Sequence, residues 1–207
     1  MLEVLGRPNS INVRKVLWLC EELGLPYRNE AWGFGELSLQ SPEYQALNPN
    51  GLVPVLRDGG FVLWESNTIC RYLAGREGRS DLLPTEAAAR ARVEQWMDWQ
   101  AGELNNAWRY AFMGLVRKSP AHQDAAAIQT SLQQWQRHMQ IAEDVLAQTG
   151  AYMAGATFTL ADVVIGLAVQ RWFMTPMDHP ALPAVAAYRE RLSARHAYLK
   201  HGRNGMP

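Results

Sequence analysis

Cysteine is scarce in this chain of 207 residues, and no pattern of metal ligands accompanies it. Cys20 and Cys70 lie far apart, without a C-x-x-C pair or a Cys/His cluster at metal-ligand spacing. Both fall within apolar helical patterns, where a cysteine usually serves as a small buried hydrophobe. The five histidines are scattered singly, without an H-E-x-x-H motif or a Ser/His/Asp arrangement. A mechanism based on the chain's own dithiol is therefore excluded, and hydrolase and metalloenzyme functions find no support.

An excess of charge and long apolar runs are absent as well. Twenty basic residues balance twenty acidic ones, so the whole chain has no field that would gather nucleic acid or acidic membrane. No stretch of 18 or more apolar residues occurs, and residues 1–10 lack a basic region followed by an apolar run. We expect a cytoplasmic protein with no nucleic-acid or membrane partner.

The hydrophobic content of 48% is sufficient for a sizeable core, and its pattern changes near residue 80. Before this point, short strand-like and helix-like segments alternate, whereas helical periodicity dominates after it. We therefore predict two domains, at residues 1–78 and 84–207.

The first domain has the pattern of a mixed sheet covered by helices. Residues 2–6 alternate like a strand, residues 12–23 have helical spacing that ends at Gly24, and residues 26–32 are a second strand candidate. Two apolar runs joined by Asp58-Gly59-Gly60 indicate a hairpin over 53–64, and a helix follows it. The order β-α-β, then β-β-α, is that of the thioredoxin-like fold.

The second domain is predicted to be entirely helical. Two long stretches, 85–118 and 121–149, have helical periodicity. Thr159 followed by Asp162 has the pattern of a capping box at the start of another helix. Residues 183–195 form a last helix, and residues 200–207 have the composition of a loose tail.

The segment NPNGLVPVLRDGGFVLWESNTICRYL resembles the glutathione-binding half of the cytosolic glutathione S-transferases, and FTLADVVIG resembles the capping box of their C-terminal domain. From GRPNSINVRKVLWLCEEL to EQWMDW and FMGLVR, the chain is most similar to bacterial transferases of the GstB type, related to the theta and nu classes. The resemblance implies a homodimeric detoxification enzyme. Its partners are glutathione, as co-substrate, and a small electrophile, without any other cofactor.

The resemblance also implies how glutathione is bound. A cis peptide bond before Pro54 turns the main chain of Val53 outward, where the cysteinyl part of the ligand pairs like an added strand. Ser66 binds the γ-glutamyl carboxylate at a helix N-terminus, and Glu65 binds the ammonium group. Taken without the resemblance, Glu65 and Ser66 have the pattern of a simple helix cap.

The glycyl carboxylate of glutathione is less well provided for. Leu52 stands where many relatives have lysine, and Gln40 is left to supply a hydrogen bond. The positive charge that those relatives place at this contact is therefore missing.

The turn before residue 13 contains the two candidates for activating the thiol. Ser10 matches the serine of theta-like relatives, whereas Asn12 matches an asparagine of nu-like relatives. A free cysteine thiol has a pKa of about 8.5, and a donor near the sulfur favours the thiolate. We expect Ser10 to be the first candidate and Asn12 the second, with a purely structural helix cap by Asn9 or Ser10 as the alternative.

The electrophile is expected between this turn and the helical domain. Trp108, Tyr110, Phe112 and Met113 recur at helical spacing, which is also typical of core residues. Arg109 among them leads to the hypothesis that it anchors an acidic electrophile, such as a haloacid. Two other functions stay open: a glutathione-dependent disulfide reductase and a non-catalytic glutathione-binding adaptor.

Overall fold

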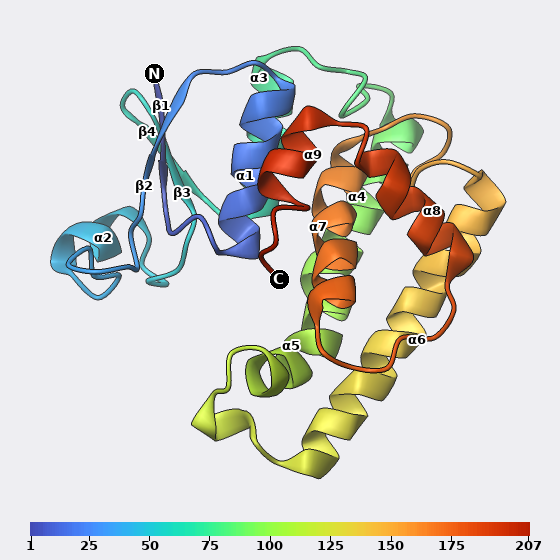
Figure 1. The fold of residues 1–207 in the computed structure, drawn as a ribbon. Coiled ribbons are helices and arrows are strands. Elements are labelled where there is room, and N and C mark those ends of the chain that lie inside the picture. The colour runs from blue at the N-terminus through green and yellow to red at the C-terminus, as the bar shows by residue number, and fades with distance from the viewer.

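Four short strands form one mixed sheet in the computed structural model, which describes residues 1–207 (Figure 1). β1 (Leu2–Leu5) pairs in parallel with β2 (Tyr27–Glu30) and antiparallel with β3 (Val55–Asp58). β4 (Phe61–Trp64) pairs with β3 through the predicted hairpin, in which Gly59 has a φ of 59°. The sheet order is β2-β1-β3-β4.

Helices cover the sheet on both faces. α1 (Ile11–Glu22) and α3 (Ser66–Arg76) lie side by side on the face toward the helical part, and α2 (Pro42–Leu47) lies on the other side (Figure 1). Successive strand residues point to opposite faces, so Val4 belongs to the main core and Leu5 to a small cluster with Tyr44 of α2. The predicted thioredoxin-like fold is confirmed.

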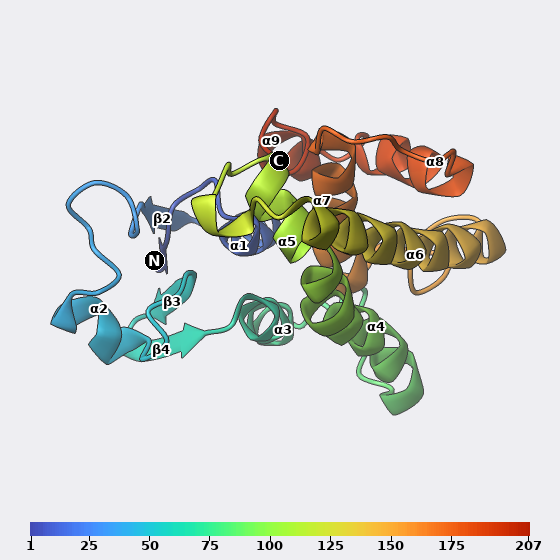
Figure 2. The same cartoon turned by 90° about the horizontal axis from the view of Figure 1, so that it is seen from below.

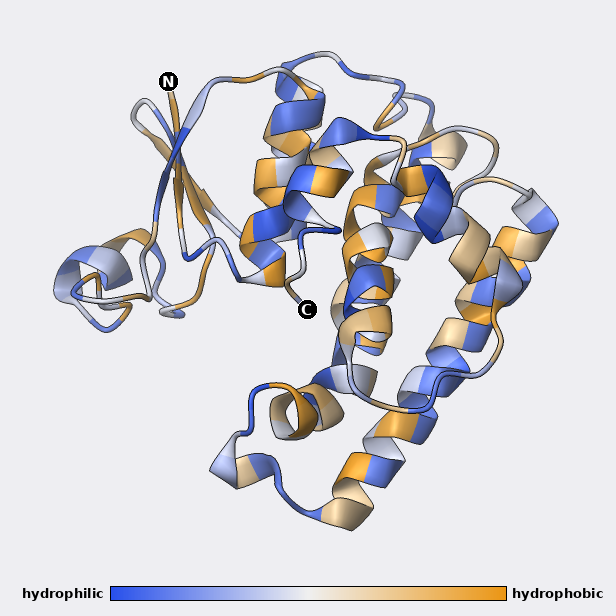
Figure 3. Cartoon of the chain, viewed as in Figure 1, coloured by the Kyte–Doolittle hydropathy of each residue, from blue (hydrophilic) through white to orange (hydrophobic).

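The remainder of the chain is helical, as predicted (Figure 2). Its elements are α4 (Ala87–Trp99), a π-helical segment (Gln100–Leu104), α5 (Asn105–Leu115), a short 3-10 helix (Pro120–His122), α6 (Ala125–Thr149), α7 (Leu160–Met174), α8 (Pro183–Leu192) and α9 (His196–His201). Hydrophobic and polar residues alternate along α6 (Figure 3). In contrast, α7 is buried on all sides from Leu160 to Trp172, as expected of a central helix.

Local signals explain several helix ends. At the start of α7, the Thr159 N–H donates to Asp162 Oδ2 over 2.8 Å, which is the carboxylate half of the predicted capping box. The stretch predicted over 85–118 begins at Ala87 and ends at Leu115. It ends because the chain folds back onto α5, where a Cβ added to Gly114 would lie 2.4 Å from the main-chain oxygen of His122.

The prediction of a loose tail at 200–207 is wrong. The Arg14 guanidinium is fully buried, and it donates to the main-chain oxygens of Met206 (3.0 Å) and Pro207 (2.8 Å). It lies 3.4 Å from Asn204 Oδ1. A buried guanidinium needs acceptors, which the tail supplies, but neither partner signals the other in the sequence.

One hydrophobic core runs through both halves of the molecule. The Trp18 ring of α1 lies 5.9 Å from Phe158, which precedes α7, and 5.0 Å from Tyr198 of α9. The α/β elements end with α3 at Arg76, and the helical ones begin with α4 at Ala87. We propose that residues 1–78 and 84–207 form the two domains.

Candidate active site

A small cavity of about 50 Å³ lies where α1 and α3 begin and the chain enters β3. It contains six of the residues predicted for the site: Asn12, Leu52, Val53, Pro54, Glu65 and Ser66. Asn48, which the sequence analysis did not assign to the site, also lines it. The fold thus brings together residues that are up to 54 positions apart in the chain, from Asn12 to Ser66.

The main chain of Val53 is open to a ligand. The Val53–Pro54 peptide bond is cis, as expected, and the Val53 N–H and C=O make no hydrogen bond within the chain. Next to it, the Leu52 oxygen accepts bonds of 2.8 Å from the Tyr44 hydroxyl and the Asn48 amide. Because a main-chain polar group requires a partner, Val53 is suited to pairing with an extended peptide.

The N-terminus of α3 is uncapped. Glu65 precedes the helix with a φ of 72°, a left-handed conformation that is uncommon outside glycine, and its side chain makes no capping bond. In contrast, Glu86 caps α4 and Asp124 caps α6 through their carboxylates. The simple capping role is therefore not realised at Glu65, and the first N–H groups of α3 remain available to an anion.

A second cavity, of about 360 Å³, lies between the start of α1 and the helical part. Five predicted residues line it: Ser10, Trp108, Arg109, Phe112 and Met113. The sequence analysis missed five others: Arg7, Ile11, Arg117, His122 and Arg171. Tyr110 does not line it and lies instead at a separate depression between α5 and α6.

Ser10 is the N-cap residue of α1, yet its hydroxyl makes no capping hydrogen bond. The neighbouring Asn9 Oδ1 is buried and has no partner either. Capping by Asn9 or Ser10 is thus not realised, and the Ser10 hydroxyl is free to donate to a ligand. Asn12 lines the smaller cavity instead.

Arg171 is a buried cation that lines the second cavity, whereas the buried Lys15 of α1 lines neither cavity. Lys15 donates to Asn67 Oδ1 (3.1 Å) and Gln100 Oε1 (2.6 Å), and burial lowers its pKa to about 8. Burial, followed by the charges of Arg14 and Arg117, holds the pKa of Arg171 well below its usual range. The second cavity, which no acidic residue lines, therefore favours anionic groups.

The two cysteines take no part in either cavity. Both are buried, and desolvation raises the pKa of each thiol to about 12. They are therefore protonated at neutral pH and inert as nucleophiles.

Gln40 lies outside the smaller cavity. Its side chain is exposed, and its Oε1 accepts a hydrogen bond from Gln45 over 3.2 Å. Its contact with the glycyl carboxylate stays a prediction.

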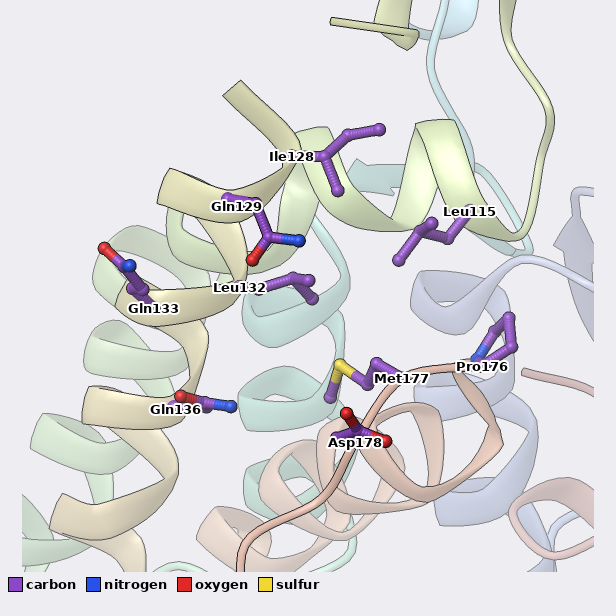
Figure 4. A pocket seen from close by; sticks show the side chains of 9 residues that line it. All are labelled: Leu115, Ile128, Gln129, Leu132, Gln133, Gln136, Pro176, Met177 and Asp178. Atoms are coloured by element: carbon purple, nitrogen blue, oxygen red, sulfur yellow. The ribbon is translucent and has the colours of Figure 1, made fainter. Parts of the chain in front are cut away.

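A third cavity, of about 600 Å³, contains none of the predicted residues. It lies between the end of α5, α6 and the segment after α7, and Figure 4 shows Gln129, Leu132 and Met177 around it. Its single ionisable side chain is Asp178, which leaves it without a nucleophile or an acid–base pair.

No group of three or more His, Cys, Asp or Glu side chains is arranged to hold a metal ion. None of the helices has the length and apolar character needed to cross a membrane.

Comparison with known proteins identifies the family. The models of the N-terminal and C-terminal domains of glutathione S-transferase match residues 9–76 and 105–196. This chain belongs to the glutathione S-transferase family. It is 37% identical to the glutathione S-transferase GstB of Escherichia coli K12 over 97% of each chain, and 35% identical to glutathione S-transferase 3 of Zea mays, covering 96% of this chain and 92% of that one.

A solved relative extends the likeness to three dimensions. The theta class glutathione S-transferase of Xanthomonas axonopodis pv. citri, with glutathione bound, superposes with a TM-score of 0.90 and 40% identity. The match covers 97% of this transferase and 96% of that chain. The predicted resemblance to GstB-type and theta-like bacterial transferases is thereby confirmed.

Proposed function

We propose that this glutathione transferase binds glutathione across the mouth of the smaller cavity, which at about 50 Å³ admits only part of the peptide, and directs its thiolate at an electrophile in the larger one. The observation that carries the proposal is the uncapped start of α3 beside the open main chain of Val53, next to a free Ser10 hydroxyl. Each of these polar groups lacks a partner within the chain, and glutathione offers a complementary group for each.

Binding of glutathione uses both ends of the smaller cavity. Ser66 and the first N–H groups of α3 hold the γ-glutamyl carboxylate, and Glu65 holds the ammonium group. Val53 pairs with the cysteinyl part. Leu52 is 62% exposed and contributes only an apolar contact, so the glycyl carboxylate depends on Gln40.

The transfer reaction then requires only that the thiolate of bound glutathione is stabilised. The Ser10 hydroxyl, with Asn12 as the second candidate, donates to the sulfur and lowers the thiol pKa, aided by the N-terminus of α1. The thiol proton passes to solvent. The sulfur attacks the electrophilic carbon, a C–S bond forms, and the leaving group departs with its electron pair.

The proposal includes three further properties that the family resemblance implies. They are a homodimeric assembly, a cytoplasmic location and a role in detoxifying small electrophiles. Trp108, Arg109, Phe112 and Met113 supply the electrophile side of the site.

A glutathione-dependent disulfide reductase is the second candidate, and one observation favours it. Asn12, the donor of nu-like relatives, lines the same cavity as Glu65 and Ser66, whereas Ser10 lines the other one. Turnover of a mixed disulfide of glutathione measures this activity directly.

The deciding experiment is a pH titration of the ultraviolet thiolate absorbance of bound glutathione. We expect a thiol pKa below the free value in the wild type, which returns toward it in Ser10→Ala. A depression that survives in Ser10→Ala and disappears in Asn12→Ala would favour the reductase. Binding without any depression would overturn catalysis and favour a non-catalytic adaptor.

A further inference from the structure

Four arginines line the larger of the two active-site cavities, the one of about 360 Å³, and none has a carboxylate partner. Arg7, Arg109 and Arg117 are exposed at its opening, whereas Arg171 of α7 is buried, with 3% of its surface accessible. No acidic residue lines the cavity. In a chain with zero net charge, this is a local excess of positive charge at the site of the second substrate.

Arg171 is the most unusual of the four. Its Nε atom is buried without a hydrogen-bond partner, and no carboxylate lies within ion-pair distance. The guanidinium lies over the rings of Phe112 (4.0 Å) and Trp108 (4.5 Å), which offsets only part of the cost of burying a charge. A buried ion without a counterion is expected where a ligand supplies one.

A second guanidinium contacts the same aromatic ring. Arg117 lies 5.4 Å from the centroid of Phe112, again without a carboxylate partner. Arg71 and Arg76 elsewhere in the chain, in contrast, pair with carboxylates at 2.5 Å. The buried Arg171 needs a counter-charge, and the exposed Arg117 beside the same ring offers a place for a second one. A group with two negative charges therefore uses both guanidiniums, whereas a monoanion uses one.

We propose that the larger cavity selects an electrophile that carries a dianionic group, such as a phosphonate, a phosphate ester or a pair of carboxylates, held by Arg171 and Arg117. This inference rests on the proposed transferase function and names its substrate class. It moves the anchor from Arg109, predicted from the sequence, to the buried Arg171. Ser10 lines the same cavity, so the bound electrophile lies beside the residue expected to activate the thiol.

The test uses three aryl chlorides that differ in charge: 4-chloro-3-nitrobenzamide, the corresponding benzoate and the corresponding phenylphosphonate. In each, the thiolate attacks the ring carbon, a C–S bond forms and chloride leaves with its electron pair. The measured quantity is kcat/KM divided by the uncatalysed rate constant with glutathione, at a pH where the phosphonate is doubly ionised. We expect this enhancement to rise from the amide to the benzoate to the phosphonate.

Substitutions of the arginines test which side chain binds the dianionic group. Arg171→Gln is expected to lower the ratio of phosphonate to amide enhancement at least about tenfold, and Arg171→Lys should restore part of it. If Arg171→Gln does not fold, the exposed Arg117→Gln provides the same test with a smaller loss. Arg137→Gln, on an exposed position of α6 outside the cavity, is the matched control and should leave the ratio unchanged.

The outcomes separate the two proposals. Turnover of the amide with equal or lower enhancement for the phosphonate than for the benzoate overturns the dianion inference and leaves the transferase intact. An effect of Arg171→Gln on the KM for glutathione alone also overturns it, because the arginine then binds the co-substrate. Absence of turnover with all three compounds, together with an undepressed thiol pKa of bound glutathione, overturns the transferase function itself.

Discussion

Ser10 and Asn12 stand two residues apart at the start of α1 and line different cavities, Ser10 the larger and Asn12 the smaller. Under the proposed function, Ser10 faces the electrophile and Asn12 faces glutathione. This arrangement makes the two candidates separable by kinetics.

Ser10→Ala is predicted to lower kcat about a hundredfold, since it removes a hydrogen-bond donor to a developing or stabilised anion. Asn12→Ala is predicted to act mainly on the KM for glutathione. Steady-state kinetics with both substrates varied measure the two effects. Asn106→Ala, exposed on α5 and outside both cavities, is the control; the reverse pattern in the two variants would exchange their roles.

Lys15 makes stability depend on pH. Its pKa falls from 10.5 to about 8 in the folded state, because burial disfavours the charge. Below the folded pKa both states are protonated. Between the two values the unfolded chain binds more protons, so stability rises with pH.

We therefore expect the stability difference between the wild type and Lys15→Met to shift by about 3 kcal/mol in favour of the wild type between about pH 7 and pH 10.5. Urea unfolding at both pH values measures it, and the subtraction removes the titration of the buried thiols. A constant difference would mean that Lys15 keeps an ordinary pKa despite its burial.

Asp162 is predicted to be essential for stability. Its buried carboxylate accepts hydrogen bonds from the Met153 N–H (3.0 Å), the Thr159 N–H (2.8 Å) and the Tyr188 hydroxyl (3.0 Å). Asp162→Asn leaves one oxygen for these donors and is expected to cost about 3 kcal/mol of unfolding free energy. Asp144→Asn, on the exposed face of α6, should cost less than about 0.5 kcal/mol in the same denaturation experiment.

Alanine at two helical glycines should change the stability of the protein in opposite directions. At Gly166 of α7, an added Cβ would lie 2.6 Å from Leu192 and 3.1 Å from Trp18, so overpacking is expected to cost about 1–3 kcal/mol. At the exposed Gly75 of α3 nothing lies within 4 Å, and Gly75→Ala should stabilise by about 0.5–1 kcal/mol. Thermal unfolding of both variants checks the pair; destabilisation by both would show that space is not the deciding factor.

The sequence predicts those features that depend on local patterns. The hairpin at Asp58-Gly59-Gly60, the helix start at Thr159 and the two-part organisation follow from turn residues, caps and periodicity within short windows. Most residues of the smaller cavity could be named because the family motif holds residues 52–66 close together along the chain, whereas Asn12 comes from the separate turn before α1.

Long-range packing accounts for what the sequence does not reveal. Arg171 reaches the larger cavity because α7 is central, and its only signal is a charged residue near the end of an apolar helix. Arg14 and the residues that accept its hydrogen bonds are about 190 positions apart. Such pairs depend on how helices pack, which periodicity alone does not specify.

The shared core around Trp18 limits how the molecule can be recombined. Because α1 of the α/β half packs against α7 and α9 of the helical half, neither half keeps its own closed interior. A chimaera that takes one half from a relative must therefore also bring the matching surface of the other half. Exchange of substrate specificity within the family is accordingly expected to proceed through loop and side-chain substitutions at the cavity rather than through the shuffling of whole domains.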